Sequence, residues 1–384
     1  VELDPARDAS HAFAVADTRD ASTVGLTSWA PTMSAVLTAA QTPAALVQRR
    51  GASIDRPQLP EWVLQGAVLG IQGGTDKVRE AVENLQAEGA ELSAVWLQDW
   101  TGVRKAQLGD RLWWTWQLDQ QQYPGWDEMV SDFNDAGIRV LTYVNTWLVD
   151  AAPKGDESIR NLFAEAEEQG YLVTDPDGGT YLLEQGGFEA ALVDLTDAAA
   201  RDWYADVIAT EVLGQGADGF MADFGEGLPV DAVLSAGDAA VEHNRWPLLW
   251  AQVVEDACER ADKPECVAWF RAGSAGQAEH APLFWNGDQM VTYDAKDGMA
   301  SVLLGTFSAG VSGWHLTHSD VGGYTSINAV VTDYVRPPEL NQRWAELEAF
   351  GVVMRSHEGN RPADNEQVYA TVDTRAAFAR MSRL

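Results

Sequence analysis

The chain is poor in basic residues, and it has no long apolar run. Only 26 lysines and arginines stand against 58 aspartates and glutamates among 384 residues, which gives a formal net charge of −32. Such a chain offers no basic face to nucleic acid or to an anionic membrane, and its acidic balance is typical of a solvated surface. Because no run reaches 18 apolar residues, we expect no stable insertion into a membrane.

Metal-ligating side chains are also scarce. The two cysteines, Cys258 and Cys266, are too few for a disulfide scaffold or a structural metal site, and we expect both to be reduced. The six histidines are scattered, and His315 with His318 lacks a third ligand at metal-binding spacing. The sequence therefore predicts neither a metal nor a cofactor.

The first 58 residues differ from the rest of the chain. HAFAVADT and TVGLTSWA are predicted to be short strands, AALVQRRGAS is loosely helical, and a proline-rich connector runs from Arg56 to Pro60. We interpret residues 1–58 as the tail of an upstream β-domain. The chain opens on Val1 with no recognisable secretory signal, so we expect it to be a fragment of a longer protein.

From Ala67 onward, strand and helix patterns alternate in the way that is typical of a parallel sheet. Helices are predicted at 75–88, from 127, and at 198–213, and excursions at 101–126 and 153–197. The eight predicted strands are AVLGIQGG, LSAVWLQDW, IRVLTYVN, GFMADF, VAWFRAG, LFWNGD, GWHLTHSD and VVMRSH. Eight such units over residues 59–384 predict an α/β fold, a (β/α)8 TIM barrel.

Two aspartates come at the ends of predicted strands, in the segments Gly216–Pro229 and Leu283–Gln289. Asp223 and Asp288 are 65 residues apart, and a barrel presents catalytic groups at the carboxyl ends of its strands. Two such carboxylates, in a chain with 16 tryptophans whose flat rings can stack on sugars, suggest a glycoside hydrolase. The alternatives are that Asp223 caps the next helix and that Asp288 belongs to a surface turn.

Several longer motifs occur together and in order. They are GIQGG (70–74), WLQDW (96–100), MADFGE (221–226), FRAGSAG (270–276), GDQ (287–289), THSDVGGYT (317–325) and MRSHEGNRP (354–362). In these segments the chain resembles glycoside hydrolase family 31 and, within it, the sulfoquinovosidases. Whole members carry an N-terminal β-sandwich before the barrel and β-domains after it, and we expect both flanks to be cut short here.

The resemblance implies a retaining mechanism with Asp223 as nucleophile and Asp288 as general acid/base, about 5 to 5.5 Å apart. We expect Asp223 to be ionised, and the pKa of Asp288, beside Trp285 and another carboxylate, to be raised. Arg271 is expected to bond sugar hydroxyls or to steer a carboxylate.

Other roles are implied for polar residues around this pair. His357 and Gln98 are expected to bind sugar hydroxyls, although a lone histidine on a strand is more often structural. Asp320 is interpreted equally well as a hydroxyl ligand or as a residue that holds its loop, and Glu226 as an anchor of the turn.

The substrate is implied by Arg111 and Trp114, spaced R-x-x-W, and by Tyr324 of GGYT. In sulfoquinovosidases these positions recognise the C6 sulfonate, for which an arginine fork, an indole N–H and a phenol O–H are suitable donors. The alternatives are an ion pair of Arg111 with Asp110 or Asp119, and ordinary loop packing of Trp114. With a net charge of −32, the sulfonate must be selected by a small local positive site.

We therefore expect a retaining α-glycosidase that hydrolyses α-sulfoquinovosides, such as sulfoquinovosyl glycerol or sulfoquinovosyl diacylglycerol, in the bacterial cytoplasm. Its partner would be this small anionic glycoside, while the sequence indicates neither the aglycone nor an oligomeric state. The alternatives are a neutral-sugar α-glucosidase or α-xylosidase, a lyase acting through the same glycosyl-enzyme, and a non-catalytic carbohydrate-binding barrel.

Overall fold

A barrel of parallel strands forms the centre of the molecule in the computed structural model, which describes residues 2–3, 14–17, 25–28, 35–36, 38–52, 58–106, 109–156, 158–328 and 333–384. Its strands are β5 (Ala67–Gly70), β6 (Leu92–Trp96), β9 (Arg139–Asn145), β13 (Gly219–Asp223), β14 (Val267–Phe270), β15 (Leu283–Trp285), β16 (Thr317–His318), β17 (Asp320–Val321) and β20 (Arg355–Ser356). Each lies within one of the eight predicted strands except β17, which extends one residue beyond its predicted strand, to Val321. The predicted (β/α)8 barrel is confirmed.

The seventh predicted strand is interrupted at Ser319, and its two halves, β16 and β17, lie at the two ends of the sheet. The strand order is β16-β15-β14-β13-β9-β6-β5-β20-β17, and every pairing in it is parallel. β16 pairs with β15 and β17 pairs with β20, so the two halves on either side of Ser319 join the ends of the sheet. The predicted continuous strand at 313–320 is therefore shorter at its start and broken at Ser319.

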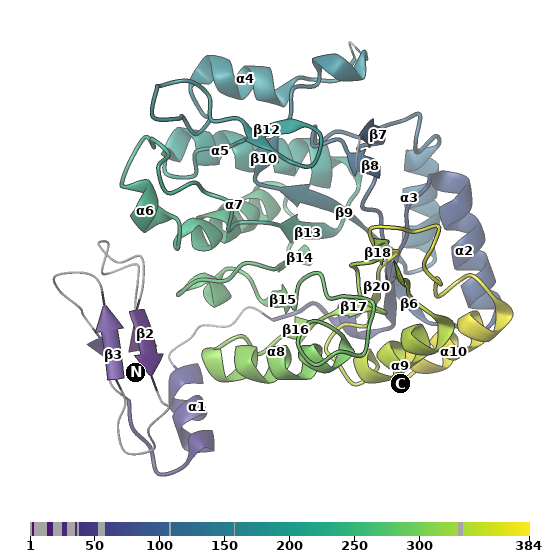
Figure 1. Ribbon diagram of the computed structural model, residues 1–384. Helices are drawn as coiled ribbons and strands as arrows, with labels where there is room; N and C mark the ends of the chain where they lie inside the picture. The colour runs from purple at the N-terminus through teal and green to yellow at the C-terminus, as the bar shows by residue number, and fades with distance from the viewer. Residues whose placement is uncertain are drawn as a thin grey trace.

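Helices surround these strands (Figure 1), with α2 and α3 on one side, α5 and α7 on another and α8 to α10 along the bottom of the view. They are α2 (Thr75–Ala87), α3 (Trp126–Asp135), α5 (Ala198–Val207), α7 (Trp246–Arg260), α8 (Met299–Ser312), α9 (Pro338–Glu348) and α10 (Val372–Ser382). The predicted helices at 75–88, from 127 and at 198–213 are confirmed, the last continuing into a π-turn at Ile208–Val212 and a 3-10 turn at Leu213–Gln215. Between β14 and β15 there is a 3-10 turn, Gln277–Glu279, in place of a helix.

The hydrophobic pattern explains this arrangement. In α2 the buried residues Val78, Ala81, Val82 and Leu85 recur every three or four positions, so one stripe faces the sheet. In β5, β6, β13 and β14 every residue is buried, as expected for parallel strands that are covered on both faces.

Two excursions from the barrel follow β6 and β9, at the same end of the sheet. The first contains the antiparallel hairpin of β7 (Val103–Ala106) and β8 (Gly109–Leu112). The second contains a small antiparallel sheet of β10 (Trp147–Leu148), β12 (Glu189–Leu192) and β11 (Leu183–Glu184), together with α4 (Leu162–Gln169). Shorter elements elsewhere are α6 (Ala239–Glu242), the 3-10 turns Glu61–Leu64 and Ala152–Lys154, and the pair β18 (Ile327–Asn328) and β19 (Asp333–Tyr334).

The first 58 residues form short elements where the structure describes them. β2 (Ala14–Asp17) pairs with β3 (Gly25–Ser28), as the two predicted strands require, and β1 (Glu2–Leu3) pairs with β4 (Ala35–Val36). The loosely helical segment is α1 (Pro43–Gly51). The first part of the predicted connector, residues 56 and 57, lies outside the described residues.

The two cysteines were expected to be reduced, and the structure shows them bonded to each other. Cys258, in the last turn of α7, and Cys266, just before β14, form a disulfide with their Cα atoms 5.9 Å apart. The expectation of reduced thiols is wrong because the turn between α7 and β14 reverses the chain and brings the two residues within bonding range.

No helix in the described part of the chain is both long enough and apolar enough to span a membrane.

Candidate active site

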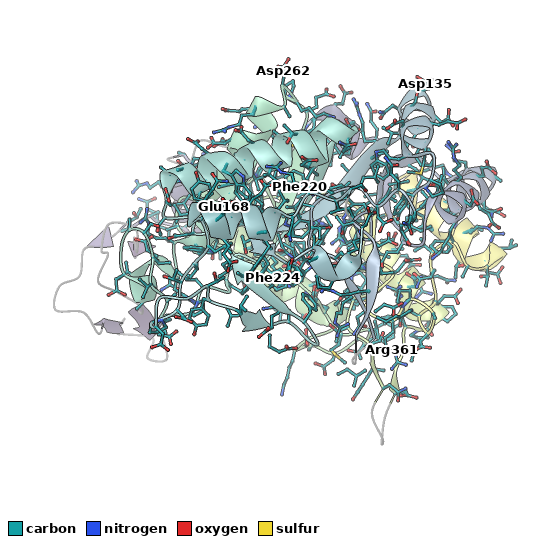
Figure 2. The ribbon with its side chains drawn as sticks, turned by 90° about the horizontal axis from the view of Figure 1, so that it is seen from above. Asp135, Glu168, Phe220, Phe224, Asp262 and Arg361 are labelled. Carbon is teal, nitrogen blue, oxygen red and sulfur yellow. A yellow bond between two sulfur atoms is a disulfide. The ribbon has the colours of Figure 1, made fainter. Side chains whose placement is uncertain are left out.

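A cavity of about 610 Å³ opens at the carboxyl ends of the barrel strands. In Figure 2, Arg361, which lines it, lies in the lower part of the view and Phe224, which also lines it, near the middle. Asp135, the last residue of α3, and Asp262, just beyond α7, lie at the upper edge. The cavity is lined by seven of the eight predicted site residues: Gln98, Arg111, Trp114, Asp223, Arg271, Asp288 and Tyr324.

Asp223 is the last residue of β13, and its side chain is held on both oxygens. The Tyr143 hydroxyl, from neighbouring β9, donates to Oδ2 at 2.6 Å, and the N–H of Phe224 donates to Oδ1 at 2.8 Å. Burial raises the pKa of Asp223, while Arg271, Tyr143 and the Phe224 N–H favour the anion and oppose that rise. These donors fix the carboxylate at the cavity wall.

The turn after Asp223 is strained. Phe224 has a φ of +60°, a conformation that is costly for a residue with a side chain. Its ring is held by Trp114 at 5.6 Å between centroids and by the Arg271 guanidinium at 4.1 Å from its centre. The strained turn therefore orients Phe224 toward two residues of the predicted site.

Arg271 links three carboxylates. It follows β14, and its Nε lies 3.3 Å from Asp223 Oδ1, its Nη1 3.4 Å from Asp288 Oδ2 and its Nη2 2.6 Å from Glu226 Oε1. The contacts with Asp223 and Asp288 agree with the expectation that it steers a carboxylate. Glu226 in turn contacts Arg271, so it holds this arginine as well as lying in the turn.

Asp288 lies three residues beyond β15 and faces the cavity with a side chain that is 40% exposed. Burial, followed by the negative charges of Asp223 and Asp320, raises the pKa of Asp288 to about 7, against the opposing effect of Arg271 and Arg355. Asp288 therefore keeps its proton below about pH 7, and three donors around Asp223 oppose the rise of its pKa. General acid catalysis beside a nucleophile requires one carboxyl that can donate a proton and one that is ionised.

The predicted sulfonate residues converge on the same cavity from distant parts of the chain. Arg111 belongs to β8, Trp114 follows it, and Tyr324 comes from the loop after β17. The alternative ion pairs of Arg111 are contradicted, because Asp110 lies 2.7 Å from Lys105 Nζ and Asp119 lies 2.8 Å from Lys154 Nζ. Trp114 does pack in its loop, with its ring against Phe188 at 5.0 Å, and it lines the cavity as well.

Next to Gln98 lies a polar network that the sequence analysis did not single out. Gln72 Nε2 donates to Gln98 Oε1 at 3.0 Å, and the Gln72 N–H donates to Glu358 Oε2 at 2.8 Å. Glu358 also pairs with Lys77 at 2.7 Å, and Asp99 accepts from the Gly73 N–H at 2.9 Å. Gln72, Asp99 and Glu358 lie in the motifs GIQGG, WLQDW and RSHEG, respectively, so their place in these motifs was the available signal.

His357 is the predicted site residue that is not part of the cavity lining. It is buried between Trp96 and Tyr324, with ring centroids 4.8 Å from each, and its Nδ1 accepts from the Gly359 N–H at 2.9 Å. Burial, together with Arg355 and Arg336, holds its pKa well below the usual range, so the ring is neutral and carries its proton on Nε2. Its direct contact is with Tyr324, and binding of hydroxyls stays a prediction.

Asp320 lies behind the cavity wall. It is fully buried and forms an ion pair with Arg355, which is also fully buried and whose Nε donates to His318 Nε2 at 3.0 Å. Asp320 was interpreted as a ligand of sugar hydroxyls or as a residue that holds its loop, and this ion pair favours the second role. No group of three histidines, cysteines or acids suited to a metal occurs among the described residues.

Comparison with known proteins places this barrel in a family. The family model described as the glycosyl hydrolases family 31 TIM-barrel domain matches residues 57–384. The chain belongs to glycosyl hydrolase family 31. Among curated proteins, family 31 relatives include a sulfoquinovosidase of Agrobacterium fabrum, 42% identical over 332 residues, which are 86% of this chain and 48% of that protein. A sulfoquinovosidase of Escherichia coli is 38% identical over 346 residues, 89% of this chain and 49% of that protein.

Solved structures of the family show the same arrangement. A family 31 sulfoquinovosidase from E. rectale, in complex with the aza-sugar inhibitor IFGSQ, has a TM-score of 0.83 and 40% identity over 89% of this chain and 50% of that one. A dextranase of Flavobacterium johnsoniae, at 21% identity and a TM-score of 0.72 over 89% of this chain and 42% of that one, shares the fold. The chain spans about half the length of the curated relatives it matches.

Proposed function

We propose that the protein is a retaining α-glycosidase that hydrolyses α-sulfoquinovosides and releases sulfoquinovose. The observation that carries the proposal is that Arg111, Trp114 and Tyr324 line one cavity with Asp223 and Asp288. Two carboxyls, one of which (Asp288) has a pKa raised to about 7, stand beside three donors suited to an anionic substituent. The similarity to sulfoquinovosidases at 38–42% identity supports the same substrate class.

In the first step, the Asp223 carboxylate attacks the anomeric carbon while Asp288 gives its proton to the departing glycosidic oxygen. This step leaves a β-linked glycosyl-enzyme and an ionised Asp288. In the second step, Asp288 takes a proton from water, the water oxygen attacks the same carbon, and Asp223 leaves as a carboxylate. Two inversions keep the α configuration, and the only groups in these steps are the substrate, one water molecule and the two aspartates.

The remaining polar residues would orient the sugar. We propose that Arg271 keeps Asp223 ionised and aligned with Asp288, because its guanidinium contacts both. Gln98, already paired with Gln72, would bind a hydroxyl or the sulfonate, and His357 would act through its contact with Tyr324 or on a hydroxyl. By resemblance we also propose the bacterial cytoplasm as its compartment.

Selection of the sulfonate must be local. The chain carries a net charge of −32, so long-range forces oppose the approach of an anionic sugar. Such forces are screened beyond about 8 Å at physiological ionic strength, whereas a contact with Arg111 is not. The charge of one arginine at the cavity wall is therefore expected to decide specificity.

The test is kcat/KM on 4-nitrophenyl α-sulfoquinovoside and 4-nitrophenyl α-glucoside, with Arg111→Ala beside the wild type. Lys105→Ala is the matched control, because Lys105 is a cation of the same hairpin that is 86% exposed and is paired with Asp110. We expect wild type and control to prefer the sulfonated substrate by more than about a hundredfold, roughly 2.7 kcal/mol, and Arg111→Ala to erase most of that preference.

Equal or better hydrolysis of the glucoside by the wild type would overturn the proposal in favour of a neutral-sugar glycosidase. Analysis of the product separates hydrolysis from elimination, because a lyase would release an unsaturated anhydro sugar instead of sulfoquinovose.

A further inference from the structure

The two faces of the β7–β8 hairpin carry opposite patterns of charge. On one face Lys105 stands directly across from Asp110, with Nζ 2.7 Å from Oδ1. On the other face Arg104 stands directly across from Arg111, which places two cations on neighbouring strands. Opposite charges in such cross-strand positions stabilise a hairpin, whereas like charges destabilise it.

No carboxylate compensates this pair within the part of the chain that the structure describes. Of the acids nearest in sequence, Asp110 pairs with Lys105, Asp119 pairs with Lys154, and Asp99 accepts from the Gly73 N–H and from Gln122. Arg111 donates from Nη1 to the backbone oxygen of Asp110 at 3.2 Å, and Nε and Nη2 of Arg104 are buried without a partner among those residues. In a chain with 58 acids and 26 bases, two adjacent arginines without counter-charges indicate a site for an anion.

Both arginines reach the same loop before β12. Arg111 lies against Gly186, where a Cβ atom would come within 3.4 Å of its Nε. The Arg104 guanidinium lies 3.6 Å from the centre of the Phe188 ring and 4.2 Å from that of Trp113. Cations in such positions are attracted to the ring faces, so Arg104 is fixed in place.

The rings connect Arg104 to the cavity. Phe188 packs edge-on against Trp114, with centroids 5.0 Å apart, and both line the cavity, as Arg111 does. Arg104 itself is half-buried behind this wall and is not among the lining residues. Burial lowers the pKa of Arg104 to about 10, so it keeps its charge at neutral pH.

We propose that Arg104 is a specificity-determining positioning residue, which adds a second fixed positive charge behind Arg111 and holds Trp114 through Phe188, and so favours sugars with an anionic C6 substituent. This inference rests on the proposed function and deepens it. Arg104 does not touch the substrate. Its charge acts across the wall on the anion that Arg111 contacts, and its stacking fixes the ring beside that anion.

The test removes the charge while keeping the packing. Arg104→Met retains an unbranched apolar side chain that can lie between Phe188 and Trp113, and Arg104→Lys retains the charge. Lys105→Met is the matched control, with the same loss of charge on the opposite face of the hairpin. For each variant, kcat/KM is measured on the sulfonated and the neutral 4-nitrophenyl glycosides, in the full-length protein.

We expect Arg104→Met to lower kcat/KM for the sulfonated substrate by about tenfold, mainly through KM, while the neutral substrate changes less than about twofold. Arg104→Lys should recover most of the ratio, and Lys105→Met should match the wild type. An equal loss on both substrates, or an unchanged ratio in Arg104→Met, would overturn the inference, since it would leave Arg104 as packing alone. Activity on the neutral substrate also reports that each variant is folded.

Binding separates this inference from the proposed function. Calorimetric titration of the wild type with sulfoquinovose and with glucose tests whether the anion is recognised at all. Equal affinity for the two sugars would overturn the proposed function, and the role of Arg104 with it. Tighter binding of sulfoquinovose in the wild type that persists unchanged in Arg104→Met would overturn the role of Arg104 alone.

Discussion

Tyr143 donates its hydroxyl hydrogen to Oδ2 of Asp223 at 2.6 Å, from the strand next to the one that Asp223 ends. A buried carboxylate that accepts such a bond is a more stable anion, because the charge loses less solvation than it would without a donor. Tyr143 therefore sets how readily Asp223 is ionised.

Tyr143→Phe is expected to lower kcat/KM by about ten- to a hundredfold and to move the acidic limb of the pH–rate profile to higher pH. The sign follows from the bond: it lowers the pKa of Asp223, so its removal raises that pKa, and a higher pH is then needed to ionise the nucleophile. The measurement is kcat/KM between pH 4 and 9.

Tyr204→Phe is the control for this prediction. Tyr204 is also fully buried and donates its hydroxyl hydrogen to a backbone oxygen, that of Asn145, instead of a carboxylate. It should lose stability, by about 1 kcal/mol, without a shift of the acidic limb. If the acidic limb shifted equally in both variants, the shift would reflect a general loosening of the buried site instead of the ionisation of Asp223.

Asp320→Asn is expected to move the basic limb of the profile to lower pH. That limb reports Asp288, whose pKa of about 7 is raised by the charge of Asp320 and lowered by that of Arg355. Removing the Asp320 charge, and leaving Arg355 without its counter-ion, both act to lower the pKa of Asp288. Because Arg355 is then buried without its partner, the variant should also lose about 3 to 5 kcal/mol of stability.

Glu348→Gln is the control that separates the effect of the Asp320 charge from the effect of repacking. Glu348 is a buried carboxyl near the same strand, bonded to Ser319, yet it is not among the groups that shift the pKa of Asp288. The basic limb should therefore stay in place in this variant. If it moved as far as in Asp320→Asn, the shift would have to come from repacking around β16 and β17.

The sequence predicted the barrel and seven residues that line the cavity, because strands and motifs are encoded in short continuous stretches. An apolar run that ends on a polar residue, such as GFMAD, determines a strand and the place of its last side chain at once. The burial of Asp320 against Arg355 and the bonding of Cys258 to Cys266 depend on contacts between segments, so the sequence left the first open and misled on the second. The position of Arg104 directly across from Arg111 depends on the register of the hairpin. That register depends on the turn, which the sequence pattern did not predict.

The disulfide predicts the number of free thiols. Protein unfolded without a reductant should show no thiol that reacts with Ellman's reagent, and two after reduction, because Cys258 and Cys266 are the only cysteines. The bond closes a loop with a sequence separation of 8 residues, so replacing both cysteines by serine should cost at most about 2 to 3 kcal/mol in the free energy of unfolding. Two reactive thiols in the protein as isolated would contradict the bond.

Glu348 predicts how stability changes with pH. Burial raises the pKa of Glu348 to about 8, while the bond to Ser319 and the charge of Arg355 oppose the rise. The group therefore takes up a proton on folding between its unfolded pKa, about 4.3, and pH 8. Its contribution to the free energy of unfolding is greatest below the unfolded pKa and falls as the pH rises toward 8.

Glu348→Gln removes this dependence, because glutamine resembles the neutral acid at every pH. Relative to wild type, the variant should therefore gain stability steadily between pH 4.5 and 8, by a few kcal/mol at the upper end at most. Urea unfolding of both proteins at four pH values across this range measures the difference. A difference independent of pH would show that Glu348 is ionised in the folded protein, with Arg355 as the charge that stabilises it.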